Sequence, residues 1–279
     1  MALKLVAIDL DNTLLRSDKS YEKERFIQVV HTLVDKGVTL VIASGNDVEK
    51  IKSYMPKEVL DKIYLAGDNG NDIEFKGEHI HTNHFSLEAL NEIAKIIDKD
   101  DELQMVVNTQ NSTYSKYIYE KDEEHVGVYY DKVNIIDSYN DIPEEELPVK
   151  CAILSSKSLE ETKKVLRQIE EEIEGVTSVT SGDGWLDAYS EDGGKGAAVA
   201  WLQSEHNVAI DETIAFGDSL NDSSMMEYAK YSVTMENADE EFKEYCNYEI
   251  GTNEDQAVIN ILEEFIKTGH TDFMASYII

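Results

Sequence analysis

Short apolar runs alternate with amphipathic segments in the N-terminal part of the chain. Leu5–Ile8 is entirely apolar, and Val38–Ala43 and Ile63–Ala66 are further largely apolar runs. Between the first two, Tyr21–Lys36 carries apolar side chains every three or four positions, which predicts a helix with one buried face that ends at Gly37. Strands that alternate with helices in this way predict a parallel sheet covered by helices.

The pattern changes near His84 and returns near Lys195. Between them the sequence predicts a less regular mixture of helices and strands, with acidic loops and many tyrosines. We therefore expect an α/β fold: a Rossmann-like parallel sheet core with helices on both faces, formed by residues 1–83 and 186–279, and an inserted α+β domain at residues 84–185.

The composition restricts the class of protein. Hydrophobic residues make up 42% and charged residues 29% of the chain, which is typical of a globular protein. The two cysteines lie far apart, no run approaches ~18 apolar residues, and Asp9 interrupts the first apolar stretch, so we expect a cytoplasmic protein. The net charge of −32 argues against binding to nucleic acid or an anionic membrane.

Polar residues that could take part in catalysis or bind a ligand recur where apolar runs stop or helices start. They are Asp9 and Asp11, Ser44 with Gly45, Lys195, and Asp218 with Asn221 and Asp222. Turn and helix-cap roles would also explain several of them. However, the carboxyl ends of parallel strands meet at one edge of a sheet, where carboxylates would bind Mg²⁺ and a lysine would attract phosphate.

These segments resemble the four ordered motifs of the haloacid dehalogenase superfamily: Asp9-Leu-Asp-Asn-Thr13, Ser44-Gly45, Lys195 and Gly217-Asp-Ser-Leu-Asn-Asp222. The position of the insertion resembles that in the Cof-type phosphatases of subclass IIB. The resemblance implies a nucleophile at Asp9 and an acid/base group at Asp11. It also implies phosphate binding by Ser44, Gly45, Lys195 and Asn221, and a Mg²⁺ site at Asp9, Asp11, Asp218 and Asp222, with Asp11 using its backbone carbonyl.

The function implied by the resemblance is a Mg²⁺-dependent phosphatase that works through an aspartyl-phosphate, with the insertion as a cap. Its partner would be a small phosphorylated metabolite such as a sugar phosphate, a nucleotide or a phosphorylated cofactor, and it would be a monomer or weak homodimer. A phosphosugar mutase and a catalytically silent metabolite-binding protein are the alternatives. Two departures bear on the substrate: Asn46 stands where similar proteins have Arg, and Trp185-Leu-Asp187 replaces a Leu-Glu-Ile run.

Two other features have expected structural roles. His79, His81 and His84 lack a suitable set of further zinc ligands, and we expect them to be exposed residues near a domain connection. Residues 268–279 end in Phe273, Met274 and other apolar side chains, so we expect them to dock on the core or on a partner subunit.

Overall fold

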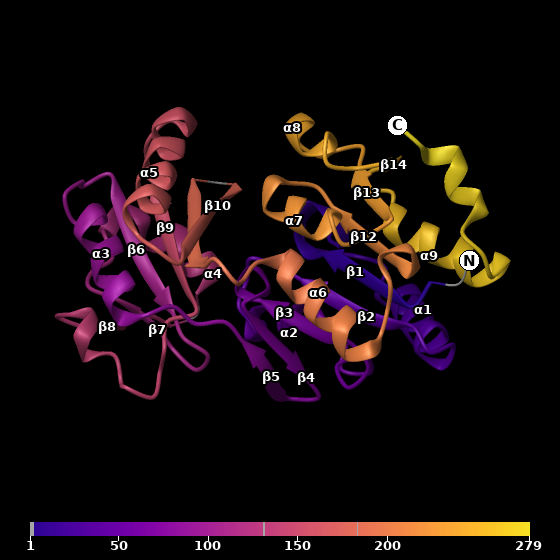
Figure 1. Cartoon of the computed structure of the whole chain (residues 1–279), viewed down its shortest axis with the longest axis horizontal. Helices are drawn as coiled ribbons and strands as arrows, with labels where there is room; N and C mark the ends of the chain where they lie inside the picture. Colours follow the sequence, from indigo (N-terminus) through magenta and orange to yellow (C-terminus); the bar gives the residue numbers. More distant parts are fainter. Residues whose placement is uncertain (1–2, 131, 183) are drawn as a thin grey trace. The chain divides into compact units, whose positions relative to one another are not determined.

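The computed structural model describes residues 3–130, 132–182 and 184–279. It divides into two compact units, Met1–His81 with Lys195–Ile279, and Thr82–Gly194 (Figure 1). In the described residues, no helix is long and apolar enough to cross a membrane.

The first unit is built on one mainly parallel sheet. Its strands, in spatial order, are β14 (Tyr248–Ile250), β13 (Tyr231–Met235), β12 (Thr213–Gly217), β1 (Leu5–Asp9), β2 (Thr39–Ala43), β3 (Tyr64–Gly67), β4 (Asp72–Phe75) and β5 (Glu78–Thr82). The pairs from β14 to β3 are parallel, and β4 is antiparallel to β3. β1 lies between β12 and β2, and its five residues are all buried, which explains its continuous apolar pattern.

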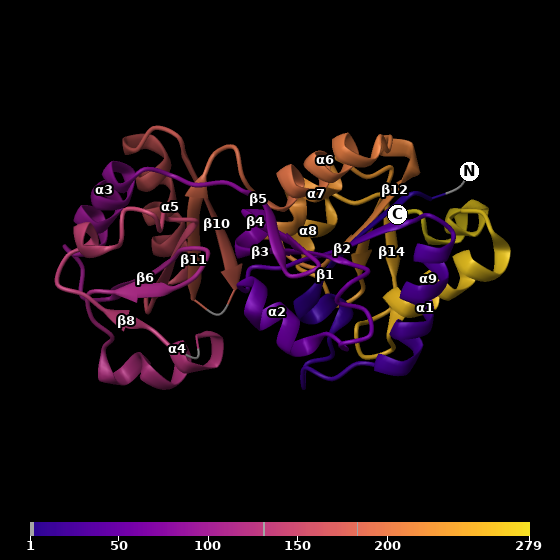
Figure 2. The ribbon, with the colours of Figure 1, turned by 90° about the horizontal axis from the view of Figure 1, so that it is seen from below.

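Helices cover both faces of this sheet, as the sequence predicts. They are α1 (Lys23–Asp35), α2 (Val48–Tyr54), α6 (Lys195–His206), α7 (Ser223–Met226), α8 (Glu240–Lys243) and α9 (Ala257–Thr268). Figure 2 shows α1, α2 and α9 on one face of the sheet, with α6 and α7 on the other. α1 buries Phe26, Val29, Val30 and Leu33, the residues whose spacing predicts this helix.

The second unit has a separate sheet and core. The strand order is β10 (Val176–Gly182), β11 (Trp185–Ser190), β9 (Lys150–Ser155), β6 (Leu103–Asn108), β7 (Thr113–Ser115) and β8 (Asn134–Ile135). α3 (Leu87–Ile97) and α5 (Leu159–Glu172) pack on one face, and α4 (Glu123–Tyr129) contributes to a smaller cluster on the other. Ser86 and Ser158 cap the first two helices with their hydroxyl groups.

The predicted end of the inserted domain at residue 185 is wrong. β11 pairs with β10 on one side and with β9 on the other, so this boundary would cut through an interior strand. The inserted unit continues to Gly194, and the chain returns to the first unit at Lys195. The first boundary, predicted after residue 83, lies after His81.

The structure bears on the expectations for the histidines and for the C-terminal segment. The expected exposure is confirmed for His79 and is wrong for His81 and His84, which are half-buried. His79 is exposed and contacts Asp72 at 2.7 Å, while His81 is half-buried and stacks on Trp201 with ring centroids 5.0 Å apart. At the C-terminus, Met274 is buried in the first unit's core, and Ile278 forms a bridge with Tyr248 at the edge of the sheet. The segment therefore docks on its own core.

Candidate active site

Three of the predicted segments meet at one edge of the first sheet. Asp9 is the last residue of β1 and pairs in register with Ala43 at the end of β2. Ser44 follows β2 directly, and Asp218 follows β12 on the other side of β1. Because these strands are parallel and adjacent, their carboxyl ends lie together, which confirms the sequence argument for this shared edge.

Lys195 connects two carboxylates at this edge. It is the first residue of α6, is 1% exposed, and donates hydrogen bonds of 2.6 Å to Oδ1 of Asp9 and to Oδ1 of Asp222. Burial alone would lower the pKa of Lys195, but Asp222 and Asp9 raise it above its ordinary value. Lys195 is therefore a protonated lysine in a buried site, able to attract an anion.

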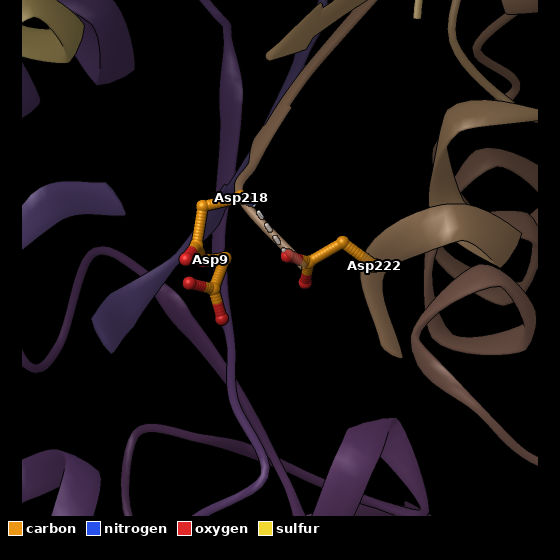
Figure 3. Close-up of side chains that lie close together, drawn as sticks. All are labelled: Asp9, Asp218 and Asp222. Atoms are coloured by element: carbon orange, nitrogen blue, oxygen red, sulfur yellow. Dashed lines mark hydrogen bonds between the residues drawn. The ribbon is translucent and has the colours of Figure 1, made fainter. Parts of the chain in front are cut away.

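Asp9, Asp218 and Asp222 form a cluster of carboxylates. One oxygen from each lies within 4.8 Å of the others (Figure 3). Burial, with the negative charge of Asp222, raises the pKa of Asp9 to about 7, and burial with Asp9 raises that of Asp218 to about 9. Because these acids resist being ionised together, a divalent cation that neutralises them would fit here, and oxygen ligands suit Mg²⁺.

The three carboxylates have different bonding partners. Both oxygens of Asp222 accept hydrogen bonds: Oδ1 from Lys195, and Oδ2 from the backbone N–H groups of Asp218 and Ser219 at 3.0 and 3.1 Å. Thr13 donates to Oδ1 of Asp218 at 3.2 Å. Because hydrogen-bond donors already occupy both oxygens of Asp222, this residue is suited to orienting its neighbours. Asp9 and Asp218 are then the better direct ligands for a cation.

Gly217 allows Asp222 to approach the end of β12. A Cβ atom at position 217 would lie 2.6 Å from Oδ2 and from Cβ of Asp222. Only glycine leaves room for the carboxylate at this distance. This gives a physical reason for the glycine at the start of the fourth motif.

Ser44, Gly45 and Asn221 are joined through a residue that the sequence analysis did not select, Asn69. Its side-chain oxygen accepts from Nδ2 of Asn221 at 3.1 Å, and its backbone N–H donates to the carbonyl of Ser44 at 2.8 Å. A Cβ at Gly45 would lie 3.4 Å from the same side-chain oxygen. Asn69 has a φ of 57°, so its place depends on an unusual turn that apolar periodicity does not predict.

Asp11 lies outside the carboxylate cluster. Its Oδ1 accepts from Nζ of Lys19 at 2.7 Å, and its Oδ2 accepts from Nδ2 of Asn46 at 2.8 Å. Asn46 also donates to Oγ of Ser44 through its side chain and its backbone N–H, each at 3.1 Å. The apolar pattern and the motifs predict neither the place of Lys19 nor the contact between Asn46 and Asp11.

A parallel sheet with several aspartates and a buried lysine at one edge is typical of a phosphoryl-transfer enzyme. The family model of the haloacid dehalogenase-like hydrolases matches residues 6–262, so the chain belongs to this family. The resemblance seen in the four motifs is thereby confirmed.

Named relatives define the chemistry at a coarse level. The chain is 26% identical over 269 residues to the 5-amino-6-(5-phospho-D-ribitylamino)uracil phosphatase YbjI of Escherichia coli (strain K12), covering 96% of this chain and 97% of the relative. It is 25% identical to the putative phosphatase YxeH of Bacillus subtilis (strain 168), with 94% and 98% covered. The protein is thus a phosphatase of this family.

Solved structures share the complete fold. SMU.1108c from Streptococcus mutans UA159 superposes with a TM-score of 0.88 at 24% identity, over 96% of this chain and 100% of that one. The subclass IIB sugar phosphatase BT4131 superposes with a TM-score of 0.78 at 16% identity, over 94% and 98%. The fold, including the inserted unit, is therefore that of the Cof-type proteins that the sequence resembles.

Proposed function

We propose that this protein hydrolyses phosphomonoesters with Mg²⁺, through a phosphorylated Asp9. The observation that carries the proposal is the buried Lys195 between Asp9 and Asp222, since it places a fixed positive charge beside a candidate nucleophile. The experiment below distinguishes this proposal from two alternatives, a phosphosugar mutase and a catalytically silent metabolite-binding protein.

The reaction divides into two transfers. The Asp9 carboxylate attacks phosphorus, the ester P–O bond breaks, and the leaving oxygen takes a proton from Asp11. A water molecule then attacks the phosphorylated Asp9 and gives a proton to Asp11, the bond between Asp9 and phosphorus breaks, and orthophosphate leaves. Asp9 and Asp11 return to their starting states.

The remaining site residues bind and orient the phosphoryl group. Lys195 attracts its negative charge, and Ser44, Gly45 and Asn221 provide hydroxyl, backbone and amide donors at the same edge of the sheet. Of the two candidate acid groups, Asp9 is tied to Lys195 whereas Asp11 lies against Lys19 and Asn46. The assignment of Asp9 as nucleophile and Asp11 as proton carrier follows the family resemblance.

Asp9 and Asp218 would hold the Mg²⁺ ion, together with the backbone carbonyl of Asp11 that the family resemblance implies. The ion would neutralise charge on the phosphoryl group during transfer. Asp222 would orient the site, because both of its oxygens are bound by donors of this chain.

The substrate is a small phosphorylated metabolite, for which the relatives suggest one candidate. YbjI of Escherichia coli (strain K12), and YwtE and YcsE of Bacillus subtilis (strain 168), are each named as a 5-amino-6-(5-phospho-D-ribitylamino)uracil phosphatase. We assign the inserted unit, residues 82–194, the role of a cap that selects the substrate. The net charge of −32 argues against nucleic-acid and anionic-membrane partners. We further propose that the enzyme is cytoplasmic and works as a monomer or weak homodimer.

A panel of phosphomonoesters, that candidate included, tests the proposal when phosphate release is measured with Mg²⁺ and with a chelator. We expect release by the wild type with Mg²⁺ and loss of release by Asp9→Asn. Asp61→Asn, at an exposed aspartate of the same unit, is the matched control and should retain wild-type turnover. Isomerised sugar phosphate without free phosphate would favour the mutase, and unchanged turnover in Asp9→Asn would refute the mechanism.

A further inference from the structure

The carboxylate of Asp11 is held from two sides by residues outside the recognised motifs. Lys19 donates to Oδ1 at 2.7 Å and Asn46 donates to Oδ2 at 2.8 Å. A carboxylate with a donor on each oxygen has little freedom to rotate about its terminal bonds. The orientation of Asp11 therefore depends on these two neighbours.

Lys19 reaches Asp11 from a turn with a defined backbone. The N–H of Arg16 donates to the carbonyl of Ser20, and the N–H of Lys19 donates to the carbonyl of Arg16, both at 2.9 Å. Lys19 has a φ of 64°, a conformation that L-residues adopt rarely and that needs support from the surroundings.

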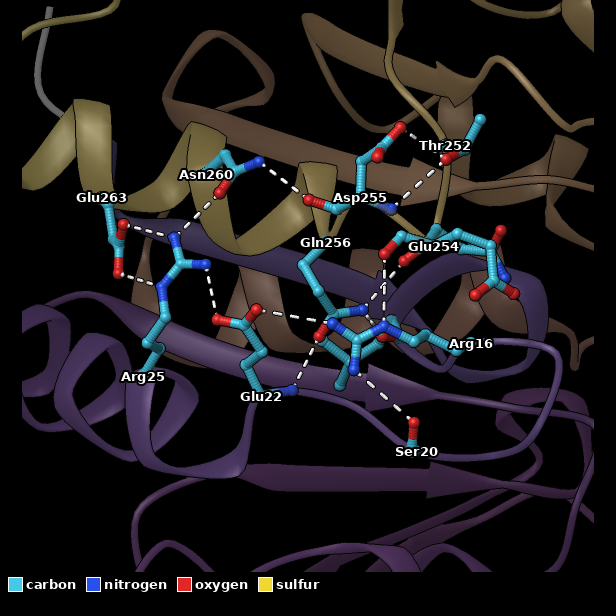
Figure 4. Close-up of polar contacts among 12 residues, drawn as sticks. Arg16, Ser20, Glu22, Arg25, Thr252, Glu254, Asp255, Gln256, Asn260 and Glu263 are labelled. Carbon is cyan, nitrogen blue, oxygen red and sulfur yellow. Dashed lines mark hydrogen bonds and ion pairs between the residues drawn. The ribbon is translucent and has the colours of Figure 1, made fainter.

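That support comes from the loop before α9, as Figure 4 shows. The Arg16 side chain donates to the carbonyl of Glu254, and the Ser17 N–H donates to the Glu254 carboxylate at 2.8 Å. At the other end of the turn, the Glu22 N–H donates to the side chain of Gln256 at 2.7 Å. Both ends of the segment that carries Lys19 are thus hydrogen-bonded to the loop before α9, which fixes the backbone from which the Lys19 side chain reaches Asp11.

Asn46 is fixed as well. Its backbone carbonyl accepts from the N–H of Asp68 at 2.8 Å, and its amide nitrogen contacts Asp11 and Ser44 together. It thereby joins the end of β1 to the end of β2. Where the family resemblance implies an arginine, this chain has a neutral amide, and the cation beside Asp11 comes from Lys19.

We propose that Lys19 and Asn46 are positioning residues that aim the Asp11 carboxyl group, which carries the proton in the first transfer, at the leaving oxygen, and that the enzyme is thereby suited to phosphomonoesters of aliphatic alcohols. The inference rests on the proposed function. An alkoxide leaving group needs a proton as the P–O bond breaks, whereas a nitrophenolate leaves readily without one. The orientation of the Asp11 side chain therefore affects the hydrolysis of esters of aliphatic alcohols and hardly affects that of nitrophenyl esters.

The test compares two esters in the full-length enzyme with Mg²⁺: glycerol 2-phosphate and p-nitrophenyl phosphate. The measured quantity is kcat/KM, which reports the first transfer, to Asp9, even when hydrolysis of the phosphorylated enzyme limits kcat. In Lys19→Met and in Asn46→Ala we expect kcat/KM for glycerol 2-phosphate to fall by about 100-fold, and that for p-nitrophenyl phosphate by less than about threefold. Lys19→Arg should recover most of the loss with glycerol 2-phosphate.

Lys76→Met is a matched control. Lys76 is another exposed lysine of the same unit with a positive φ, 55°, in the turn between β4 and β5. It should leave both kcat/KM values unchanged. Lys19 is 44% exposed at its side chain, so the variant is expected to fold, and a thermal melt checks this.

Two outcomes separate the proposals. Phosphate release from neither ester by the wild type would refute the proposed function and this inference with it. An active wild type whose Lys19→Met and Asn46→Ala variants lose the same factor on both esters would refute only the positioning role.

Discussion

Replacing Lys195 with Met removes a buried cation while keeping the length of the side chain. Lys195 is 1% exposed and binds Asp9 and Asp222, which are 5% and 0% exposed. Removing one partner of a buried ion pair costs about 3–5 kcal/mol, because the remaining charge has neither water nor a counter-ion. Asp222 keeps two backbone donors whereas Asp9 loses its ammonium partner, so Asp9 accounts for most of the expected loss.

The loss should depend on pH. Lys195 lowers the pKa of Asp9 and of Asp218, so its removal makes both acids harder to ionise in the folded state. Above about pH 7 the wild type ionises Asp9 beside Lys195, whereas the variant must either ionise it without a cation or keep it protonated. Below that pH, Asp9 can bind a proton and the difference from wild type becomes smaller.

Urea unfolding of both proteins with a chelator, at about pH 8.5 and about pH 5.5, measures this difference. Lys267→Met is the control, since Lys267 lies on α9 with a side chain 76% exposed and pairs with Glu264; it should cost less than about 0.5 kcal/mol. A loss below about 1 kcal/mol for Lys195→Met at the higher pH, or an equal loss at both pH values, would refute the reasoning.

Two further predictions concern the same edge of the sheet. Burial and neighbouring carboxylates raise the pKa of Asp9 to about 7 and that of Asp218 to about 9, so their contribution to stability is greatest below about pH 4 and is lost as the pH rises through those values. Mg²⁺ should therefore raise the melting temperature of chelator-treated protein more at about pH 8.5 than at about pH 5.5, and an equal rise at both would contradict a metal site at these acids. Gly217→Ala should cost about 1–3 kcal/mol and lower kcat/KM, because the new Cβ would lie 2.6 Å from the Asp222 carboxylate; wild-type stability and turnover would show that this contact is not required.

The sequence predicted the parts of the site that regular structure positions. Asp9 ends a buried strand, Ser44 and Asp218 each follow one, and Lys195 begins a helix, so periodicity was sufficient to bring them to one edge. The parallel sheet and its covering helices follow from the same alternation, whereas the spatial order of the strands does not.

Residues that reach the site through turns could not be predicted in this way. Lys19 and Asn69 both have a positive φ, and their positions depend on hydrogen bonds to distant segments. The end of the inserted domain was predicted at residue 185 for a different reason: all six residues of β11 are buried, Asp187 among them, so this strand lacks the alternation of a half-exposed strand. Tertiary packing, which a single sequence does not display, decided these cases.

The position of β1 between β2 and β12 has a consequence for protein synthesis. Thr13 and Asp218, which hydrogen-bond at this junction, are 205 residues apart in the chain. The ribosome therefore synthesises β1, β2 and the whole inserted unit before β12. During that time the edge of β1 that pairs with β12 has no partner strand. An unpaired apolar strand edge is prone to intermolecular pairing, so a nascent chain that stops before Gly217 is the form of this protein most exposed to aggregation and to chaperone capture.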